Sequence, residues 1–164
     1  MYTIQSSPSQ TEAARLDFPK TSMRQYQVRY SAVTVGTVSD QEIFIDGIAN
    51  KRLQLPPDCT VTVHAIYSAF AYVTATEAFV AGAGAIATAS GTNNAGAVLQ
   101  VAAPTITSIP AASPTASMTV AFNDTNDCLR IGVTQATAAN SAFHEVIVTV
   151  SIANKQPVVT GAIN

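Results

Sequence analysis

Few residues in this sequence could serve as a catalytic acid or base close to a nucleophile. His64 and His144 are the only two histidines, and Asp124 and Asp127 are acids that a turn could bring near one of them. Nucleophilic catalysis needs a nucleophile, a base and an orienting group held together. No Gly-x-Ser-x-Gly motif offers an activated serine. We therefore expect both histidines to bond to neighbouring groups in strands or at an interface, and we expect no enzymatic activity.

Two short patterns resemble ligand-binding motifs. Residues 82–87 read Gly-x-Gly-x-x-Ala, but dinucleotide binding also requires a following helix and an acid about 20 residues on, where this chain has Thr107. Residues 123–127 supply Asn and Asp oxygens, but they lack the glycine and the bidentate Glu of a calcium loop. We expect close backbone packing or a bulge at the glycines, an Asx-stabilised hairpin turn at 123–127, and neither a cofactor nor a metal.

The cysteines and the N-terminus indicate an intracellular origin. Cys59 and Cys128 are far apart and have no metal-ligand spacing, so we expect two reduced, partly buried thiols. The first 20 residues have neither a basic segment nor an apolar core of a secretory signal. No apolar run reaches the length of a membrane span, so we expect no membrane partner.

Charge is sparse and unevenly distributed. Only 11% of residues are charged while 48% are hydrophobic, whereas a soluble domain carries about 25% charge. The net charge of -2 argues against nucleic acid as a partner. Charged residues are concentrated in the first 58 positions, and none occurs from Ala78 to Asn123. We expect this uncharged stretch to face a core, a symmetry partner or a neighbouring subunit; the alternative is a neutral loop surface.

Strand signals dominate from residue 25 onward. Apolar residues in 25–37 alternate and then shift phase, which predicts a bulge or bend near Ser31. The turn-rich segments are GTNNAG (91–96), PAASP (110–114), NDTND (123–127) and QATAANS (135–141). The strands expected between such turns are 25–37, 42–46, 53–55, 60–75, 77–88, 97–103, 105–109, 117–123, 128–134 and 143–152.

This arrangement predicts an all-β fold, a β-sandwich or jelly roll with an extended N-terminal arm. The expected divisions are an arm at residues 1–24, a sandwich domain at 25–154 and a tail at 155–164. The longest strand, 60–75, is apolar on one face, and its other face carries His64, Ile66, Phe70 and Tyr72 among polar residues. Such a strand belongs between a core and an interface.

Three stretches resemble a β-sandwich module of structural proteins in tailed bacteriophages, which occurs in fibre, spike and capsid-decorating proteins. Residues 53–63 (LQLPPDCTVTV) are similar to the segment leading into its first long strand. Residues 123–134 (NDTNDCLRIGVT) are similar to its Asn-rich hairpin, and residues 143–152 to its closing strand. The resemblance covers about 100 residues, with Phe143-His144-Glu145 where such modules often carry a Trp.

The resemblance implies virion assembly, with the chain made in the host cytoplasm. We expect a capsid cement or decoration protein that stabilises the head shell; the alternatives are a tail fibre, spike or receptor-binding adhesin and a lectin-like or carbohydrate-acting protein. The expected partners are the chain itself, as a homotrimer or homodimer, and the major capsid protein or another virion protein. Arg24, Arg29, Lys51 and Arg52 are expected to pair with acidic groups of a neighbour. The interface residues predicted are Tyr2, Ile4, Leu16, Phe18, Arg24, Arg29, Phe70, Tyr72 and Phe79.

Overall fold

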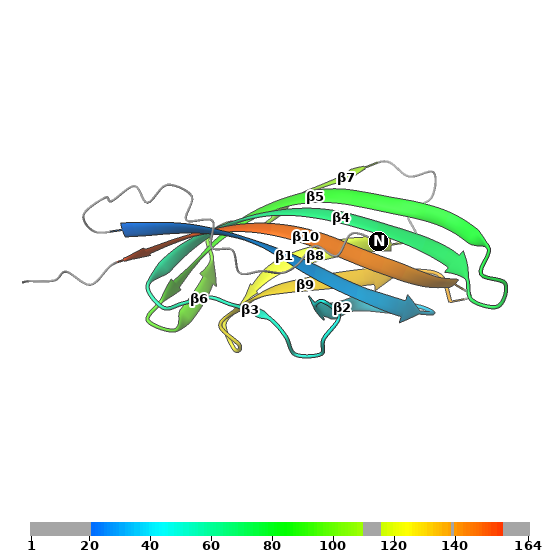
Figure 1. The fold of residues 1–164 in the computed structure, drawn as a ribbon, viewed down its shortest axis with the longest axis horizontal. Helices are drawn as coiled ribbons and strands as arrows, with labels where there is room; N and C mark the ends of the chain where they lie inside the picture. The colour runs from blue at the N-terminus through cyan, green and yellow to red at the C-terminus, as the bar shows by residue number, and fades with distance from the viewer. Residues whose placement is uncertain (1–20, 110–115, 139, 156–164) are drawn as a thin grey trace, which may run out of the picture.

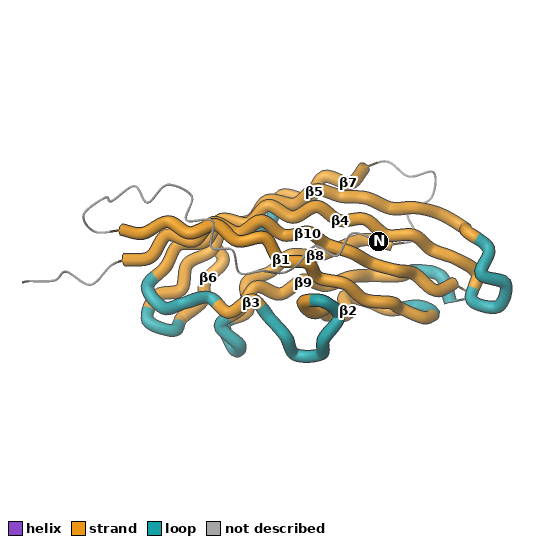
Figure 2. Tube along the Cα trace, viewed as in Figure 1, coloured by secondary structure: helices purple, strands orange, loops and turns teal. Residues whose placement is uncertain are grey.

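The computed structural model describes residues 21–109, 116–138 and 140–155, so the predicted arm at 1–24 lies outside the described residues except for its last four. Regular structure in these ranges is antiparallel β, which confirms the all-β prediction (Figures 1 and 2). The described residues form no helix of the length and hydropathy needed to cross a membrane. The strands are β1 (Thr21–Val35), β2 (Val38–Ile45), β3 (Leu53–Gln54), β4 (Cys59–Val73), β5 (Phe79–Asn94), β6 (Ala97–Gln100), β7 (Thr105–Ile109), β8 (Ala116–Asn123), β9 (Cys128–Gln135) and β10 (Asn140–Lys155).

The strands form one sheet that curls over its own core, in the order β3-β9-β2-β1-β10-β4-β5-β6, with β7 beside β5 and β8 beside β9. We call β1, β10, β4 and β5, with β6 and β7 at their edge, the large layer. The small layer contains β2, β3, β8 and β9, and it is joined to the large layer where Tyr30 and Ser31 of β1 pair with β2. Figure 1 shows the long strands of the large layer running side by side along the longest axis.

The inner face of the large layer supplies much of the core. On β4 every second residue is buried, from Val61 through Val63, Ala65 and Tyr67 to Ala69. These residues pack with those of β8 and β9 in the small layer, among them Met118, Val120, Leu129 and Ile131. The predicted alternation of this strand is therefore confirmed, and its other face points away from the core.

The bulge predicted near Ser31 is absent from the β1–β10 ladder. Pairing is continuous from Thr21↔Lys155 to Val35↔Ser141. The phase shift in the sequence has another cause: Val33 and Val35 are apolar but point outward, where 56% and 66% of their surface is exposed. The bulge was wrongly predicted because apolar residues were assumed to mark the buried face.

One of the predicted turns is largely strand. β5 continues through residues 91–94 of the GTNNAG segment, and the reversal occurs at Ala95-Gly96, both at positive φ. The Asn93 amide is buried and donates a 2.8 Å hydrogen bond to the Leu55 carbonyl. Polar composition misled the prediction for residues 91–94 because the Asn93 side chain is buried. The QATAANS segment does contain a turn, at residues 136–138 between Gln135 at the end of β9 and Asn140 at the start of β10.

Candidate interaction surface

His144 does not lie at a site that a substrate could reach. Its ring is buried between two hydroxyls, with Nε2 2.8 Å from Thr34 Oγ1 and Nδ1 2.9 Å from Tyr67 Oη. Burial lowers the pKa of His144 to about 4, so the ring is neutral at pH 7. The Thr34–His144–Tyr67 chain therefore satisfies a polar group inside the core.

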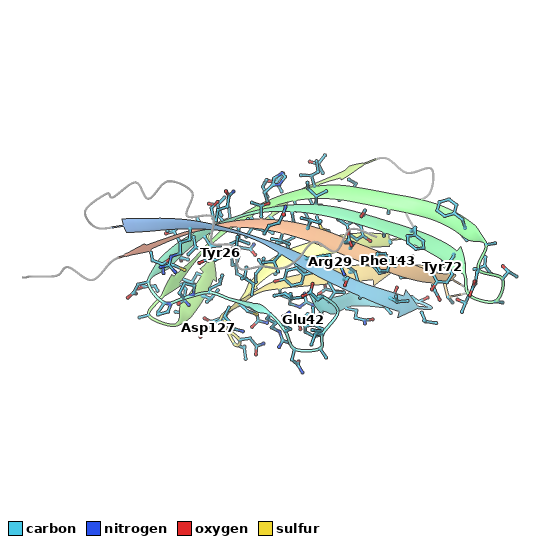
Figure 3. All side chains as sticks on the ribbon, in the orientation of Figure 1. Tyr26, Arg29, Glu42, Tyr72, Asp127 and Phe143 are labelled. Atoms are coloured by element: carbon cyan, nitrogen blue, oxygen red, sulfur yellow. The ribbon has the colours of Figure 1, made fainter. Side chains whose placement is uncertain are left out.

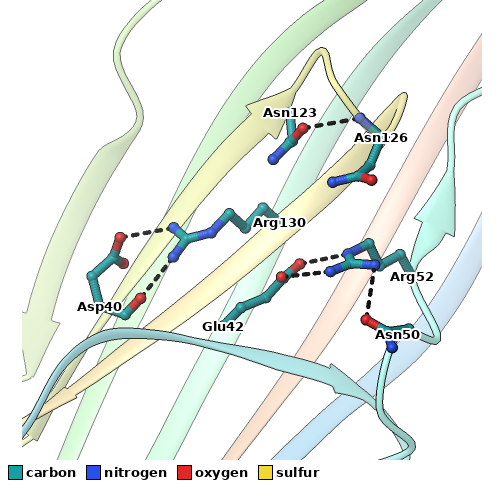
Figure 4. Close-up of polar contacts among 7 residues, drawn as sticks. All are labelled: Asp40, Glu42, Asn50, Arg52, Asn123, Asn126 and Arg130. Atoms are coloured by element: carbon teal, nitrogen blue, oxygen red, sulfur yellow. Dashed lines mark hydrogen bonds and ion pairs between the residues drawn. The ribbon is translucent and has the colours of Figure 1, made fainter.

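The acids of the β8–β9 turn are not brought to either histidine. Asp124 Oδ1 accepts a hydrogen bond of 2.6 Å from the backbone N–H of Val98, which ties the turn to β6. Asn123 Oδ1 accepts from the N–H of Asn126 at 3.0 Å, so the predicted Asx turn is confirmed (Figure 4). No group of three or more His, Cys, Asp or Glu side chains in the described ranges is arranged to hold a metal ion.

The glycine motif at residues 82–87 lies inside β5, and a strand position is incompatible with the helix that a dinucleotide fold requires.

Two glycines of β5, Gly91 and Gly82, differ in what lies next to their backbone. A Cβ atom on Gly91 would lie 2.8 Å from the ring of Phe122, which packs on the Gly91 backbone from β8. A Cβ on Gly82 would meet nothing nearer than the Ala69 carbonyl at 3.7 Å, and its φ is not positive.

The surface of the large layer that points away from the core is rich in apolar side chains; we call it the outer face. By strand alternation and register it consists of Gln25, Gln27, Arg29, Val33 and Val35 on β1; Phe143, Glu145, Ile147, Thr149 and Ser151 on β10; Thr62, His64, Ile66, Ser68, Phe70 and Tyr72 on β4; and Phe79, Gly82, Gly84, Ile86, Thr88 and Ser90 on β5.

Two apolar rows cross the outer face from strand to strand. Ile147, Ile66 and Ile86 are paired in register on β10, β4 and β5, and Ile66 is 49% exposed. In the second row Phe143 and Phe70 are paired, with ring centroids 5.5 Å apart and Phe70 47% exposed. Isolated exposed apolar residues are normal on a protein surface, whereas contiguous rows of them mark an interaction site.

The aromatic row extends toward one end of the large layer. Tyr72 lies 6.1 Å from Phe70, centroid to centroid, and pairs in register with Phe79, which is largely exposed. Figure 3 shows Phe143 and Tyr72 near this end of the large layer, and Glu42 and Asp127 on the side of the small layer. The rings therefore form one exposed cluster across β10, β4 and β5.

The charge on the outer face is self-compensated. Among the outer-face residues named above, the charged ones are Arg29 and Glu145, whose Nη1 and Oε2 atoms are 3.5 Å apart. Arg29 Nε also lies 4.0 Å from a carboxylate oxygen of Asp46 at the margin of the face. Exposed pairs of this kind contribute little to stability, but here they leave the face without net charge.

Arg52 and Lys51 are also paired with acids of their own chain, and Figure 4 shows the Arg52–Glu42 pair. Arg52 binds both carboxylate oxygens of Glu42 at 2.8 Å and lies over the Phe44 ring. Lys51 Nζ lies 3.0 Å from Asp46. The cations predicted to pair with a neighbouring subunit thus include three, Arg29, Lys51 and Arg52, that already have partners in their own chain.

A second polar cluster fixes β2 over β9. Thr119 Oγ1 donates to Asp40 Oδ1 at 2.5 Å, and Arg130 contacts the other carboxylate oxygen at 2.9 Å and the Asp40 carbonyl at 2.7 Å. The Thr119 hydrogen bond, with help from Arg130, lowers the pKa of Asp40. Asp40 and Thr119 occupy the space where a side chain at Gly132 would be, so this cluster is part of the packing of the small layer.

The predicted interface residues separate into three groups. Arg29, Phe70, Tyr72 and Phe79 lie on the outer face. Arg24 lies elsewhere, at the end of the molecule, where it lines a shallow hollow of about 280 Å³ with Tyr26, Leu53, Gln54, Pro56, Ile152 and Asn154. Tyr2, Ile4, Leu16 and Phe18 lie outside the described residues.

Several residues of the outer face were not among the predicted interface residues. Ile86 and Ile147 lie in register beside Ile66, and that row exists only once β10, β4 and β5 are paired. Val33 was missed because its strand was assigned the wrong phase. Strand alternation gave a usable signal on β4, where the mixed face was recognised from sequence.

No protein-family model and no curated protein sequence matches this chain. The structure is similar to part of the crystal structure of the Acinetobacter baumannii phage AM24 tailspike protein. The TM-score is 0.37 with 10% identical residues, and the likeness covers 87% of this chain and 27% of the tailspike chain. A likeness this distant carries no argument about function.

Proposed function

We propose that this chain is a structural protein of a tailed bacteriophage virion and that its outer face is buried against a neighbouring virion subunit. The observation that carries the proposal is the outer face itself: the rows of Ile147, Ile66 and Ile86 and of Phe143 and Phe70 are exposed or half-exposed and nearly uncharged. Burying such rows removes apolar surface from water, which is the main favourable term in protein association. The sequence resemblance at residues 53–63, 123–134 and 143–152 supplies the virion context.

Within the virion we propose a capsid cement or decoration protein, which contacts the major capsid protein and further copies of itself. A receptor-binding tip would need long exposed loops, and in the turn-rich segments 91–96 and 135–141 the described residues outside strands are only 95–96 and 136–138. Asn93, Gln135, Asn140 and Ser141 of these segments are buried. This observation supports a role in lateral packing over one in receptor contact.

We also propose that the chain acts by adhesion and has no catalytic role. His144 has no exposed surface and its two ring nitrogens contact hydroxyls of its own chain. His64 is exposed on the outer face, where its register neighbours are Thr149 and Thr88. Neither neighbour is a carboxylate that could orient the imidazole as a general base.

Electron microscopy of phage particles carrying a labelled form of this chain tests the proposal. Labels over the whole head, with a copy number that scales with that of the major capsid protein, are the expected result. Labels confined to the tail, with a few copies per particle, would replace the cement assignment with the tail alternative. Absence of the chain from purified particles would contradict the virion assignment itself.

A further inference from the structure

We propose that the outer face pairs with the outer face of a second copy of this chain, sheet against sheet, around a two-fold axis. The proposal rests on the proposed function in one respect, that the outer face is the surface buried in assembly. It goes further by naming the occupant. In such an interface the same patch is used twice, so the patch must be complementary to itself.

The distribution of charge on the outer face is compatible with pairing against an identical face. Arg29 and Glu145 compensate each other within the face, and the remaining positions are apolar, hydroxyl, amide or glycine apart from His64. A partner recognised by charge would need a surplus of one sign, which this face lacks. Two identical neutral surfaces can meet without leaving an unpaired charge buried.

The shape of the outer face is also self-complementary. Phe70 on β4 projects beside Gly82 on β5, its partner in register, and the next pair along these strands is Ser68 and Gly84. A two-fold axis parallel to these strands and between them places Phe70 of each copy over Gly82 of the other. At this pair a large side chain of β4 then lies above bare backbone of β5 in both directions, and Ile66 of each copy meets Ile86 of the other.

No side chain of the same chain fills the space beside Gly82, which follows a β-bulge where Tyr72 pairs with Phe79 and Ala71 with Ala81. The φ of Gly82 is not positive, and a Cβ atom at this position would make only ordinary contact, 3.7 Å from the Ala69 carbonyl. Glycine in a strand interior weakens the strand and often marks a place where another surface approaches closely. Gly91 in the same strand differs, because the Phe122 ring of its own chain occupies the space above it. The bulge can account for a glycine near this position, but the backbone at Gly82 stays uncovered and is open to a second surface.

The size of the outer face suits a stable dimer. From Thr62 to Tyr72 the face is about 34 Å long, and the four strands that this axis brings together, β10, β4, β5 and β7, span about 19 Å, which gives at most about 650 Å² in projection. A standard interface buries about 800 Å² on each partner, and the relief of the side chains raises the accessible area above the projected one. Sheets packed face to face lie about 10 Å apart with strands within about 30° of each other.

The mass of the purified full chain in solution tests the pairing. We expect about 34 kDa, twice the chain mass of 17.0 kDa, at micromolar concentration. Ile66→Lys buries two charges at the interface and is expected to weaken the dimer about 100-fold or more. Ile48→Lys is the matched control, because Ile48 is similarly exposed (55%) but lies in the β2–β3 connection; it should remain dimeric.

Gly82→Leu tests the specific arrangement. A leucine side chain there fills the space that Phe70 of the second copy needs, so the variant should be monomeric, and its thermal unfolding temperature should be at or above that of the monomeric Ile66→Lys protein. A Gly82→Leu protein that remains dimeric would contradict the placement of Phe70 over Gly82. Thermal unfolding of each variant separates loss of pairing from loss of folding.

Cross-linking gives a readout that is independent of affinity. Ser68 and Ser117 are both exposed strand serines, on the outer face and on β8 of the small layer respectively. Ser68→Cys should be linked into a dimer by a bis-maleimide that spans about 10 Å, the spacing of face-packed sheets. Ser117→Cys should give no such product. Equal cross-linking of both variants, or of neither, would contradict the pairing.

Failure of the self-pairing can be distinguished experimentally from failure of the proposed function. If the wild-type chain is monomeric at high concentration and yet Ile66→Lys is lost from phage particles, the outer face is an assembly surface with a different occupant. That result overturns the self-pairing and leaves the proposed function standing. If the wild type is dimeric through this face and absent from particles, the self-pairing stands and the virion role is wrong.

Discussion

Phe70 of β4 and Gly82 of β5 are partners in register at the surface of the large layer, so a half-exposed aromatic ring projects directly beside bare backbone. Within one chain this pairing leaves apolar surface in water and a strand weakened by glycine. Both costs are removed if a second surface covers the pair. This relationship connects the strand pairing of the fold with the proposed role in assembly.

Substitution of the strand glycines by alanine should have opposite effects at two positions. Gly82→Ala should raise the free energy of unfolding by about 0.4–1 kcal/mol, because the methyl group fits the folded state and restricts the unfolded chain. Urea unfolding of a monomeric background such as Ile66→Lys measures this without a contribution from pairing. A loss of stability at Gly82 would show that the fold itself requires this glycine.

Gly91→Ala should destabilise the protein by about 1–3 kcal/mol, because its Cβ would lie 2.8 Å from the Phe122 ring. The matched test is a double-mutant cycle with Phe122→Leu, which removes the ring atoms that clash. The two substitutions should be less harmful together than the sum of their single effects. Strict additivity would mean that the contact between the two residues does not cause the loss.

Stability should fall with acidification through His144. The folded-state pKa is about 4, below the ordinary value of 6.5, so this residue adds stability that is complete above about pH 6.5 and is lost as the pH falls toward 4. The loss at pH 4 is up to about 3 kcal/mol. Both hydroxyl neighbours, Thr34 and Tyr67, can accept from a protonated ring, so burial alone opposes the charge.

Urea unfolding at a series of pH values checks this, with His144→Gln and His64→Gln as the pair of variants. The pH 4–6.5 loss should persist in His64→Gln, because that side chain is exposed, and should shrink in His144→Gln. An unchanged pH profile in His144→Gln would assign the acid sensitivity to other groups.

Replacing arginine by lysine at position 52 and lysine by arginine at position 51 should affect stability differently. Arg52→Lys loses the bidentate contact with Glu42 and the position over the Phe44 ring, and we expect the thermal unfolding temperature to fall. Lys51→Arg keeps an exposed ion pair with Asp46 and should change stability by less than about 0.5 kcal/mol. Thermal unfolding of the two variants in parallel gives the comparison; equal effects would contradict it.

The two cysteines should be unreactive in the folded protein. Cys59 and Cys128 are buried free thiols, and burial raises the pKa of both. A maleimide at pH 7 should modify them only after unfolding, with mass spectrometry counting the adducts. Rapid modification of native protein would show that one of these thiols is accessible and would require their removal before cross-linking through residue 68.

The sequence allowed the strands to be predicted better than their pairing. Alternation over residues 60–75 predicted β4 and both of its faces, and the Asn-rich segment at 123–127 predicted the β8–β9 turn. The local sequence pattern gave wrong predictions where an apolar residue is exposed or a polar residue is buried, as with outward-pointing Val33 and buried Asn93. In both cases the deciding contacts come from strands far away in the chain.

The outer face could be predicted only in part for the same reason. Phe70 and Tyr72 belong to a strand whose mixed face was visible in the sequence. The row of Ile147, Ile66 and Ile86 depends on register between three strands, and no local pattern encodes that register. The roles of Arg29, Phe70, Tyr72 and Phe79 in an interface remain predictions that the variants above address.

Incorporation of two matched variants into phage particles tests the central claim most directly. Particles are purified from cells that supply the Ile66→Lys or the Ile48→Lys chain in place of the wild type, and the copy number of the chain is measured by mass spectrometry. Since only Ile66 lies on the outer face, we predict that Ile66→Lys is depleted from particles while Ile48→Lys is present at the wild-type level. Incorporation of Ile66→Lys at the wild-type level would contradict the claim that the outer face is the assembly surface.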